Sequence, residues 1–476
     1  MKSKPPPNIL FIMADDHAAK SISCYGAGIN STPHLDRLAK EGMRFNHCYV
    51  TNSICTPSRA AILCGTHNHV NGVVTLDSKI NKRLPNIAKQ LRSAKLPTHK
   101  GQSKGGYQTA MIGKWHLGEG RDHEPTGFDY WSVVPGQGEY WDPQFLEPGG
   151  KTTRVPGYAT DIITDKTLDF IRGRDKSRPF FAMYHHKAPY RSWEYDPKHK
   201  DLYKEPVRLP DTFTDNYKNW ANTAKVTKIR IAEDLTYTDL GLVQPEGPAA
   251  EVGVDRKVPA PVDPREIRPL IYKETGQSFR FKTPAELAEF KFQRYIQRYL
   301  RTIQSIDDNV SRLLDFLNKE GLAENTVFDK RFIYEESFQI PLLLRYPREI
   351  SPGSVYDDIV SNVDFAPTFL NLAGVAYHRY WIHNDVIHNA YAHYGYYEDL
   401  GLEGARPSAG GEEGRDKEWE LFDCEKDPLE LFNCYDDPKY AKVVELITRK
   451  LEEKMAEIGD EPVHDDRQLE SCRKEC

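Results

Sequence analysis

Residues 51–65 read TNSICTPSRAAILCG, a pattern that predicts a turn leading into a helix. Pro57 suits the first turn of such a helix, where its missing N–H costs nothing. The helix N-terminus offers free N–H groups and the positive end of a dipole, so an anion is favoured beside Cys55. Arg59 follows one helical turn later and can return its guanidinium to the same place. A thiol at this position is expected to have a lowered pKa. The stretch predicts a reactive thiol beside an oxyanion pocket; the alternative is a buried structural cysteine.

The length and composition favour a globular protein with more than one core. A chain of 476 residues suits one large domain and a smaller one. Charged residues make up 28% and hydrophobic residues 39%, which is ordinary for a globular protein in water. The net charge of −6 and the pI near 6.3 give no sign of a nucleic-acid partner. An anionic substrate therefore has to meet a local positive pocket.

The chain also lacks the patterns of membrane insertion and export. No apolar run approaches the roughly 20 residues that span a bilayer. The N-terminal residues MKSKPPP run directly into an expected strand, without the apolar stretch of a signal peptide. We expect no membrane partner and a cytoplasmic location as the sequence stands, or a periplasmic or secreted one if a leader has been lost.

A pair of carboxylates follows the first apolar segment. Residues 8–14, NILFIMA, are typical of a strand buried in the centre of a parallel sheet. Asp15 and Asp16 come directly after it, at the end of the strand where open α/β sheets hold their ligands. Adjacent carboxylates repel unless a cation or hydrogen-bond donors neutralise them. We predict a cation here; the alternative is a helix N-cap with a solvated neighbour.

A second strand is followed by a lysine and a histidine. Residues 107–113, YQTAMIG, lead into GKWHLG at 113–118. Lys114 and His116 alternate with Trp115, so in an extended chain they face the same side. Around a tetrahedral anion the lysine neutralises charge and the histidine transfers protons. The alternative is a surface lysine and a structural histidine.

These motifs together resemble type I sulfatases of the alkaline-phosphatase-like group. The resemblance rests on Cys-x-Pro-x-Arg at 55–59 with Ala-x-Leu-x-Gly behind it, on GKWHLG, and on the aspartate pair. The resemblance covers most of the chain and is strongest to bacterial N-acetylglucosamine-6-sulfatases and mucin-desulfating sulfatases. It implies that a formylglycine-generating enzyme oxidises Cys55 to formylglycine, whose hydrate attacks sulfur. It also implies that Asp15, Asp16 and residue 55 hold one Ca²⁺, that Arg59, Lys114 and Lys330 hold the sulfate, and that His116 assists the nucleophile.

The resemblance also implies the fold and the domains. We expect an α/β protein with a large, mostly parallel central sheet sandwiched by helices, and a smaller C-terminal antiparallel sheet with a final helix. The expected domains are 1–375, with a covering insertion at 200–280, then 376–465, and a tail at 466–476. A mobile linker is the alternative for 200–280. The apolar spacing of residues 284–320 predicts a long amphipathic helix.

The chain departs from the family pattern after the strand at 178–184. Sulfatases carry a proton-donating histidine in this loop, where the present chain has Tyr190. A phenol, with a reference pKa of about 10, is a poorer acid at neutral pH. His186 could compensate only if the loop were aimed differently. We expect both residues to contact the substrate.

A second departure follows Thr326. The family has a core strand there whose last residues complete the Ca²⁺ shell, but only Val327 and Phe328 precede Asp329 and Lys330 in this chain. We therefore expect the strand and its two metal ligands to be absent. Because Ca²⁺ prefers about six to eight oxygen ligands, we also expect impaired activity.

A histidine- and aromatic-rich segment follows residue 375. By resemblance, His383, Asn384 and His393 lie over the active site and contact sugar; a zinc site is the alternative. The sequence thus predicts a sulfatase acting on a sulfated sugar such as N-acetylglucosamine 6-sulfate. The alternatives are a non-catalytic protein that binds sulfated sugars with unmodified Cys55, and a phosphoester hydrolase, which needs more metal ligands than the sequence offers.

Overall fold

The computed structural model describes residues 5–96, 105–220, 230–243, 263, 265, 269–331, 339–375, 392–397, 418–423, 426–427 and 432–458. Contacts divide the chain into two compact units. The first contains the described residues up to Lys204 and those from Gln297 to 375, and the second contains those from Glu205 to Ile296 and from 392 onward. The predicted domain boundaries at 375 and 465 stay predictions.

A ten-stranded sheet runs through the described part of the first unit, in the order β14-β2-β13-β12-β1-β8-β4-β5-β6-β7. Its five central strands, β12 to β5, are parallel. They are β12 (Thr326–Arg331), β1 (Asn8–Met13), β8 (Phe180–His185), β4 (Gln108–Lys114) and β5 (Tyr130–Val134). The flanking strands are β13 (Leu342–Arg345), β2 (Met43–Phe45), β14 (Ser354–Tyr356), β6 (Gln144–Glu147) and β7 (Lys151–Arg154). Two short strands, β3 (Cys48–Tyr49) and β15 (Val360–Ser361), pair with each other.

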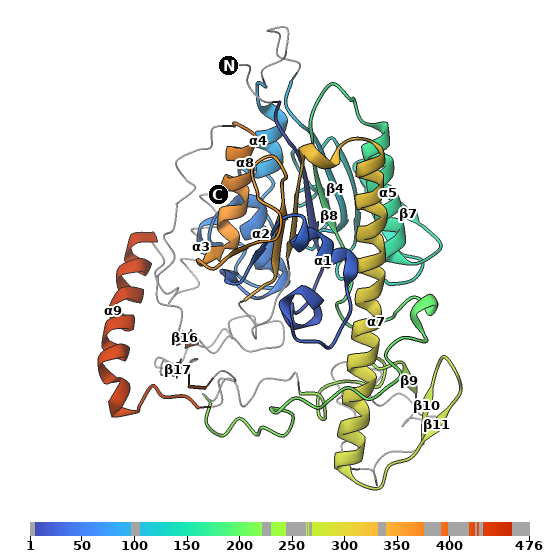
Figure 1. Ribbon diagram of the computed structural model, residues 1–476, viewed down its shortest axis with the longest axis vertical. Helices are drawn as coiled ribbons and strands as arrows, with labels where there is room; N and C mark the ends of the chain where they lie inside the picture. Colours follow the sequence, from blue (N-terminus) through green and yellow to red (C-terminus); the bar gives the residue numbers. More distant parts are fainter. Residues whose placement is uncertain are drawn as a thin grey trace. The chain divides into compact units, whose positions relative to one another are not determined.

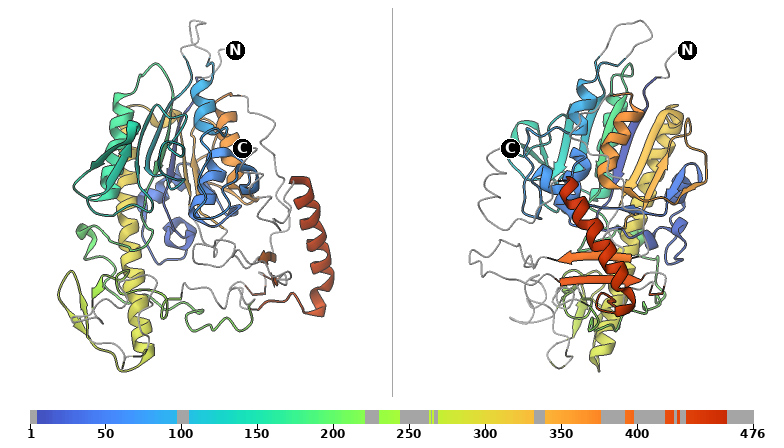
Figure 2. Two further views of the ribbon diagram at one scale, coloured as in Figure 1. Left: turned by 180° about the vertical axis from the view of Figure 1, so that it is seen from behind. Right: turned by 90° about the vertical axis from the view of Figure 1, so that its left-hand side faces the viewer.

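Helices cover both faces of this sheet (Figures 1 and 2). One face carries α2 (Cys55–Cys64), α3 (Asn68–Asn71), α4 (Ile87–Ser93) and α8 (Phe365–Leu372), and the other carries α1 (Pro33–Lys40), α5 (Ala159–Gly173) and α7 (Pro284–Lys319) from Gln297 onward. β1 is buried along its whole length: Phe11 faces the first group of helices and Ile12 faces the second. A strand covered on both faces favours apolar residues along its length, which is why residues 9–14 form a continuous apolar run after Asn8. The predicted layered architecture is confirmed, as is the long helix.

The strand register brings the functional segments to one edge of the sheet. Met13, His185 and Gly113 lie side by side on β1, β8 and β4. Gly113 has φ of +96°, and a Cβ added there would lie 1.8 Å from the carbonyl oxygen of His185. The close approach of the two strands therefore requires glycine just before Lys114.

The prediction that a core strand is missing after Thr326 is wrong. β12 pairs in parallel with β1 from Asn8↔Thr326 to Met13↔Arg331, and it pairs antiparallel with β13. The N–H and C=O groups along this edge of β1 need partners. Six residues are enough for a strand, so Asp329, Lys330 and Arg331, which we expected beyond the strand, form its second half.

The second unit contains small antiparallel sheets and helices. β9 (Leu242–Val243), β10 (Leu270–Tyr272) and β11 (Ser278–Phe279) form one sheet next to the part of α7 that ends at Ile296. β16 (Ala392–Tyr397) and β17 (Glu418–Asp423) form an antiparallel pair, and α9 (Ala441–Ile458) is the last described helix. The predicted C-terminal antiparallel sheet and final helix are confirmed.

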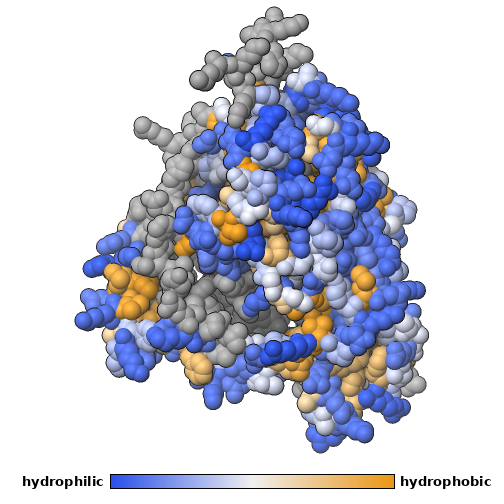
Figure 3. All heavy atoms as spheres, viewed as in Figure 1, coloured by the Kyte–Doolittle hydropathy of each residue, from blue (hydrophilic) through white to orange (hydrophobic). Residues whose placement is uncertain are grey.

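The visible surface is mainly hydrophilic, with small and separate apolar patches (Figure 3). Among the described helices, none is both long enough and apolar enough to cross a bilayer.

Candidate active site

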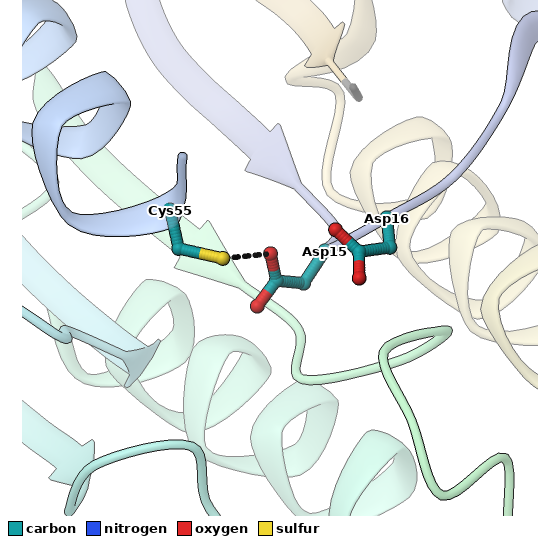
Figure 4. A group of neighbouring side chains, drawn as sticks. All are labelled: Asp15, Asp16 and Cys55. Atoms are coloured by element: carbon teal, nitrogen blue, oxygen red, sulfur yellow. Dashed lines mark hydrogen bonds between the residues drawn. The ribbon is translucent and has the colours of Figure 1, made fainter. Parts of the chain in front are cut away.

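Cys55 lies at the first position of α2, whose ten residues are all buried. The chain enters the helix from extended backbone at Ile54, and Ser58 N–H closes the first turn on the Ile54 carbonyl at 3.0 Å. The Cys55 thiol points at the end of β1 and donates to Asp15 Oδ1 at 3.3 Å (Figure 4). The prediction that a helix begins at Cys55 is thus confirmed.

The expectation of a lowered thiol pKa is wrong. Burial raises the pKa of Cys55 well above its usual range, and the Asp15 carboxylate raises it further. Lys114 and Arg59 act in the opposite direction but do not outweigh these two effects. A helix N-terminus acidifies a thiol that water can reach, whereas this thiol is 8% exposed and faces a negative charge.

Asp15 lies at the centre of a buried charge cluster. Lys114 Nζ donates to its Oδ2, and Arg59 Nη2 lies 3.6 Å from the same oxygen. Burial by itself would raise the pKa of Asp15, but Lys114 and Arg59 outweigh it and lower the pKa to about 2. Asp15 is therefore charged at neutral pH.

Asp16 lies next to Asp15, and its carboxyl group is turned toward the same space (Figure 4). Burial and the Asp15 charge raise the pKa of Asp16 to about 7. Ligand atoms of Asp15, Asp16 and Cys55 all lie within 4.8 Å of one another. The charged Asp15 carboxylate and the Asp16 carboxyl group, whose ionisation Asp15 suppresses, supply hard oxygen donors, which fits a hard cation such as Ca²⁺.

Two cations approach the cluster from α2 and β4. Arg59 Nη1 donates to the Lys114 carbonyl at 2.7 Å, which ties α2 to the end of β4. Lys114 is fully buried, and its ammonium contacts Gln137 as well as Asp15. The structure therefore brings together Asp15, Cys55, Arg59 and Lys114, as the sequence predicted.

His116 reaches the site by a different path from the one predicted. Its φ is +55°, so the chain turns after Trp115 and the alternation of an extended strand does not apply. Its Nδ1 lies 3.4 Å from Thr56 Oγ1, beside Cys55. Burial, Lys114 and Arg59 lower its pKa to about 3, so the imidazole is neutral at physiological pH.

His186 and Tyr190, the two residues after β8 that were predicted to contact the substrate, lie in different environments. His186 is fully buried and packs edge-on against Tyr184, with ring centroids 4.4 Å apart. Tyr184 contacts Thr164 on α5, so His186 lies on the α5 side of the sheet and not on the α2 side. Tyr190 lies in the charge cluster, with its ring centroid 4.4 Å from Lys114 Nζ.

The other predicted substrate residues are described only in part. Lys330 lies within β12, opposite Ile12 of β1 and Leu343 of β13. His393 lies in β16, opposite Phe422 of β17. His383 and Asn384 lie outside the described residues.

Sequence reasoning missed His185, Gln137, Lys187 and Tyr140. His185 Nδ1 lies 3.3 Å from the Lys114 carbonyl and 3.4 Å from Arg59 Nη1, on the α2 side of β8. Burial and then Arg59 lower the pKa of His185 well below its usual value. Period-two alternation along β8 could have identified it, because Phe181 and Met183 face α2 and the next residue on that face is His185. No pattern in the sequence pointed to the other three.

Two family models together match residues 7–397. The model described as Sulfatase matches residues 7–328. The model described as N-sulphoglucosamine sulphohydrolase, C-terminal, matches residues 323–397.

Individual proteins agree with these matches. N-acetylglucosamine-6-O-sulfatase of Bacteroides thetaiotaomicron is 35% identical over 521 aligned residues, covering 95% of this chain and 87% of that protein. The structure of BT4656 in complex with its substrate D-glucosamine-2-N,6-O-disulfate has a TM-score of 0.79 and 32% identity, covering 97% of this chain and all of that one. Phosphonate monoester hydrolase of Agrobacterium radiobacter shares the fold, with a TM-score of 0.64 and 17% identity over 95% of this chain and 96% of that one. This chain therefore belongs to the sulfatase family, and with it to the sulfuric ester hydrolases.

Proposed function

We propose that this protein hydrolyses the sulfate ester of an amino sugar such as N-acetylglucosamine 6-sulfate. The observation that carries the proposal is the cluster of Cys55, Asp15, Lys114 and Arg59 at the carboxyl edge of the sheet, in a chain 35% identical to an N-acetylglucosamine-6-O-sulfatase. A cysteine in the family motif, an acidic cation site and two buried cations in contact support hydrolysis of a sulfate ester.

Two groups complete the proposed site. Asp15 and Asp16, with residue 55, would hold one Ca²⁺, because one ligand atom of each lies within 4.8 Å of the others. A formylglycine-generating enzyme would convert Cys55, whose Cys-x-Pro-x-Arg context matches the family motif. When present, the ion supplies positive charge beside the sulfate, and the modified residue supplies the nucleophilic oxygen.

The chain's own residues have distinct roles in this proposal. Lys114 and Arg59 bring two positive charges to the N-terminus of α2. Because both are buried, they would stabilise the negative charge of a bound sulfate more strongly than exposed cations would. His116, which is neutral at physiological pH, lies beside residue 55 and can assist its nucleophilic oxygen as a hydrogen-bond acceptor. His185 holds its ring against Arg59 and the Lys114 carbonyl and so orients the guanidinium.

Impaired activity stays a prediction, although one of its two reasons no longer holds. Impaired activity was expected from a lost strand and two lost metal ligands, and the strand is present. The two ligands, which the family has in the last residues of this strand, were expected to be absent, and that expectation stays a prediction; residues 332–338 lie outside the described part of the chain. Reduced turnover thus stays a prediction that the following assay decides.

The test is release of inorganic sulfate by protein coexpressed with a formylglycine-generating enzyme and supplied with Ca²⁺. N-acetylglucosamine 6-sulfate and 4-nitrophenyl sulfate are compared as substrates, and peptide mass spectrometry measures conversion of Cys55. Cys55→Ala should abolish turnover. Cys64→Ala is the matched control, because Cys64 is a buried cysteine at the other end of the same helix, and it should retain turnover.

Two outcomes would reject the proposal. Fully converted protein without turnover on either ester would exclude a sulfatase acting on these substrates. Sulfate release that survives Cys55→Ala would exclude residue 55 as the nucleophile. Binding of the sulfated sugar by protein with unmodified Cys55, without release, would favour the non-catalytic alternative.

A further inference from the structure

Two buried lysines meet the aromatic ring of Tyr190. Lys114 Nζ lies 4.4 Å from the ring centroid and Lys187 Nζ lies 5.2 Å from it. Lys187 Nζ also lies 4.7 Å from the centroid of the Tyr140 ring. Both lysines are buried, at 0% and 5% exposure, so water contributes little to their solvation. Ring faces are therefore part of what stabilises these ammonium groups.

The loop that carries Tyr190 is tied down at both ends. The Tyr140 hydroxyl donates to the Tyr190 carbonyl, and Tyr140 is itself buried. Lys187 Nζ donates to the Arg191 carbonyl at 3.0 Å, which closes the loop on itself. The Tyr190 N–H donates to the Lys187 carbonyl at 3.1 Å. The Tyr190 ring is thus presented to Lys114 by a loop with fixed hydrogen bonds.

The ring has a direct effect on the charge cluster. The face of an aromatic ring carries negative electrostatic potential, which attracts a cation placed over it. The Lys114 ammonium contacts the Tyr190 ring as well as Asp15 and Gln137, so the ring limits the positions that the ammonium can take. Without the ring, the Lys114 ammonium could move away from the N-terminus of α2. Lys187 would lose an aromatic neighbour that stabilises its charge.

We propose that Tyr190 is a positioning residue that acts through the face of its ring: it holds the Lys114 ammonium in the sulfate site and stabilises Lys187 beside it. The hydroxyl of Tyr190 is not needed as an acid for the departing sugar oxygen. This inference rests on the proposed function, because the role of Lys114 is to bind sulfate. It predicts that phenylalanine can replace Tyr190 and that leucine cannot.

The experiment compares Tyr190→Phe and Tyr190→Leu with the wild-type enzyme, all with converted Cys55. Tyr190→Phe should stay within about twofold of wild type in kcat/KM on both N-acetylglucosamine 6-sulfate and 4-nitrophenyl sulfate. Tyr190→Leu should lose about 30-fold on both, the size expected when a desolvated cation loses an aromatic partner. Tyr130→Leu is the matched control: Tyr130 stacks on Phe170, so its loss lowers stability and should leave kcat/KM unchanged.

A proton-donor role would give a different pattern. In that case Tyr190→Phe would lose activity mainly on the sugar sulfate, whose leaving group needs a proton, and would keep it on the aryl sulfate. That result, or loss of the alkaline limb of the pH–rate profile in Tyr190→Phe, would overturn the inference. Wild-type activity in Tyr190→Leu would overturn it too.

A measurement without turnover separates this inference from the proposed function. Calorimetric titration with inorganic sulfate should give weaker binding in Tyr190→Leu and unchanged binding in Tyr190→Phe, whether or not the wild-type enzyme turns over. Equal sulfate affinity in all three proteins would refute the positioning role even if the enzyme is active. An inactive wild type with the expected affinity pattern would reject the proposed function alone.

Discussion

Replacing Asp15 by asparagine tests the charge cluster most directly. Asp15 is 3% exposed, contacts Lys114 and lies 3.6 Å from Arg59. Burial favours its neutral form, yet its pKa is lowered from 3.8 to about 2 because the two cations prevail. At about 1.36 kcal/mol per pKa unit, that difference is worth about 2–3 kcal/mol in favour of the charged form. Breaking a buried charge cluster by removing one member costs about 3–5 kcal/mol. We expect Asp15→Asn to lose about 2–4 kcal/mol of unfolding free energy at pH 7.

The pH dependence of this loss has a definite sign. The folded-state pKa lies below the unfolded one, so the contribution is present above about pH 3.8 and disappears as the pH falls toward 2. The difference between wild type and Asp15→Asn should therefore be full at pH 7 and narrow below pH 4. Urea denaturation followed by tryptophan fluorescence, in the presence of EDTA, measures it.

Calcium provides the second half of the test. A ligand that binds the folded protein alone stabilises it by about 2.7 kcal/mol at 100 times its dissociation constant. Wild type should gain such stability on adding Ca²⁺, and Asp15→Asn should not. Asp307→Asn is the matched control, because Asp307 is a buried carboxylate that accepts from the His34 and Leu35 N–H groups. That control should be destabilised but keep the Ca²⁺ response.

The reasoning fails if Asp15→Asn unfolds within about 0.5 kcal/mol of wild type in EDTA, or if it gains as much stability from Ca²⁺ as wild type. The first result would mean that the cations find other partners at no cost. The second would place the Ca²⁺ elsewhere.

Three further predictions concern neighbouring residues. Arg59→Lys should lower kcat/KM about 100-fold in the sulfatase assay, because a lysine cannot reproduce the guanidinium fork. Gly113→Ala should lower the unfolding free energy by more than about 3 kcal/mol, because the added Cβ would collide with the His185 carbonyl. Gly120→Ala, also at positive φ but with open space around it, should lower it by about 1 kcal/mol. Thermal unfolding of the two variants measures the difference. The pKa of His116 is about 3 when folded and about 6.5 when unfolded, so its contribution makes stability rise with pH between these values. His116→Gln should therefore flatten the stability profile by up to about 2 kcal/mol between pH 5 and 6.5, as measured by denaturation at each pH.

Local pattern carried a large part of the fold. The nearly continuous apolar run of β1 identified a strand covered on both faces, because burial on two sides favours apolar residues at successive positions. The 3.6-residue spacing of α7 identified a long amphipathic helix in the same way. These patterns record how many sides of each segment are buried, and a single sequence displays that information directly.

Pairing across the sheet was harder to predict. The expected loss of a strand after Thr326 counted residues up to Asp329, whereas β12 continues through the charged residues to Arg331. What decided the outcome was the need of β1 for backbone partners, a requirement that belongs to another part of the chain.

The candidate site shows the same division. Its helix-start cysteine, its carboxylates and its two cations could be predicted from short motifs, because these residues stand at the predicted ends of strands and helices. The raised pKa of Cys55, the place of His185 and the ring of Tyr190 under Lys114 could not. The sequence by itself determined which groups are available and on which elements they lie. Tertiary structure decided how they act, because burial and charge–charge distances arise only when strand register brings β1, β4 and β8 to one edge and α2 packs against them.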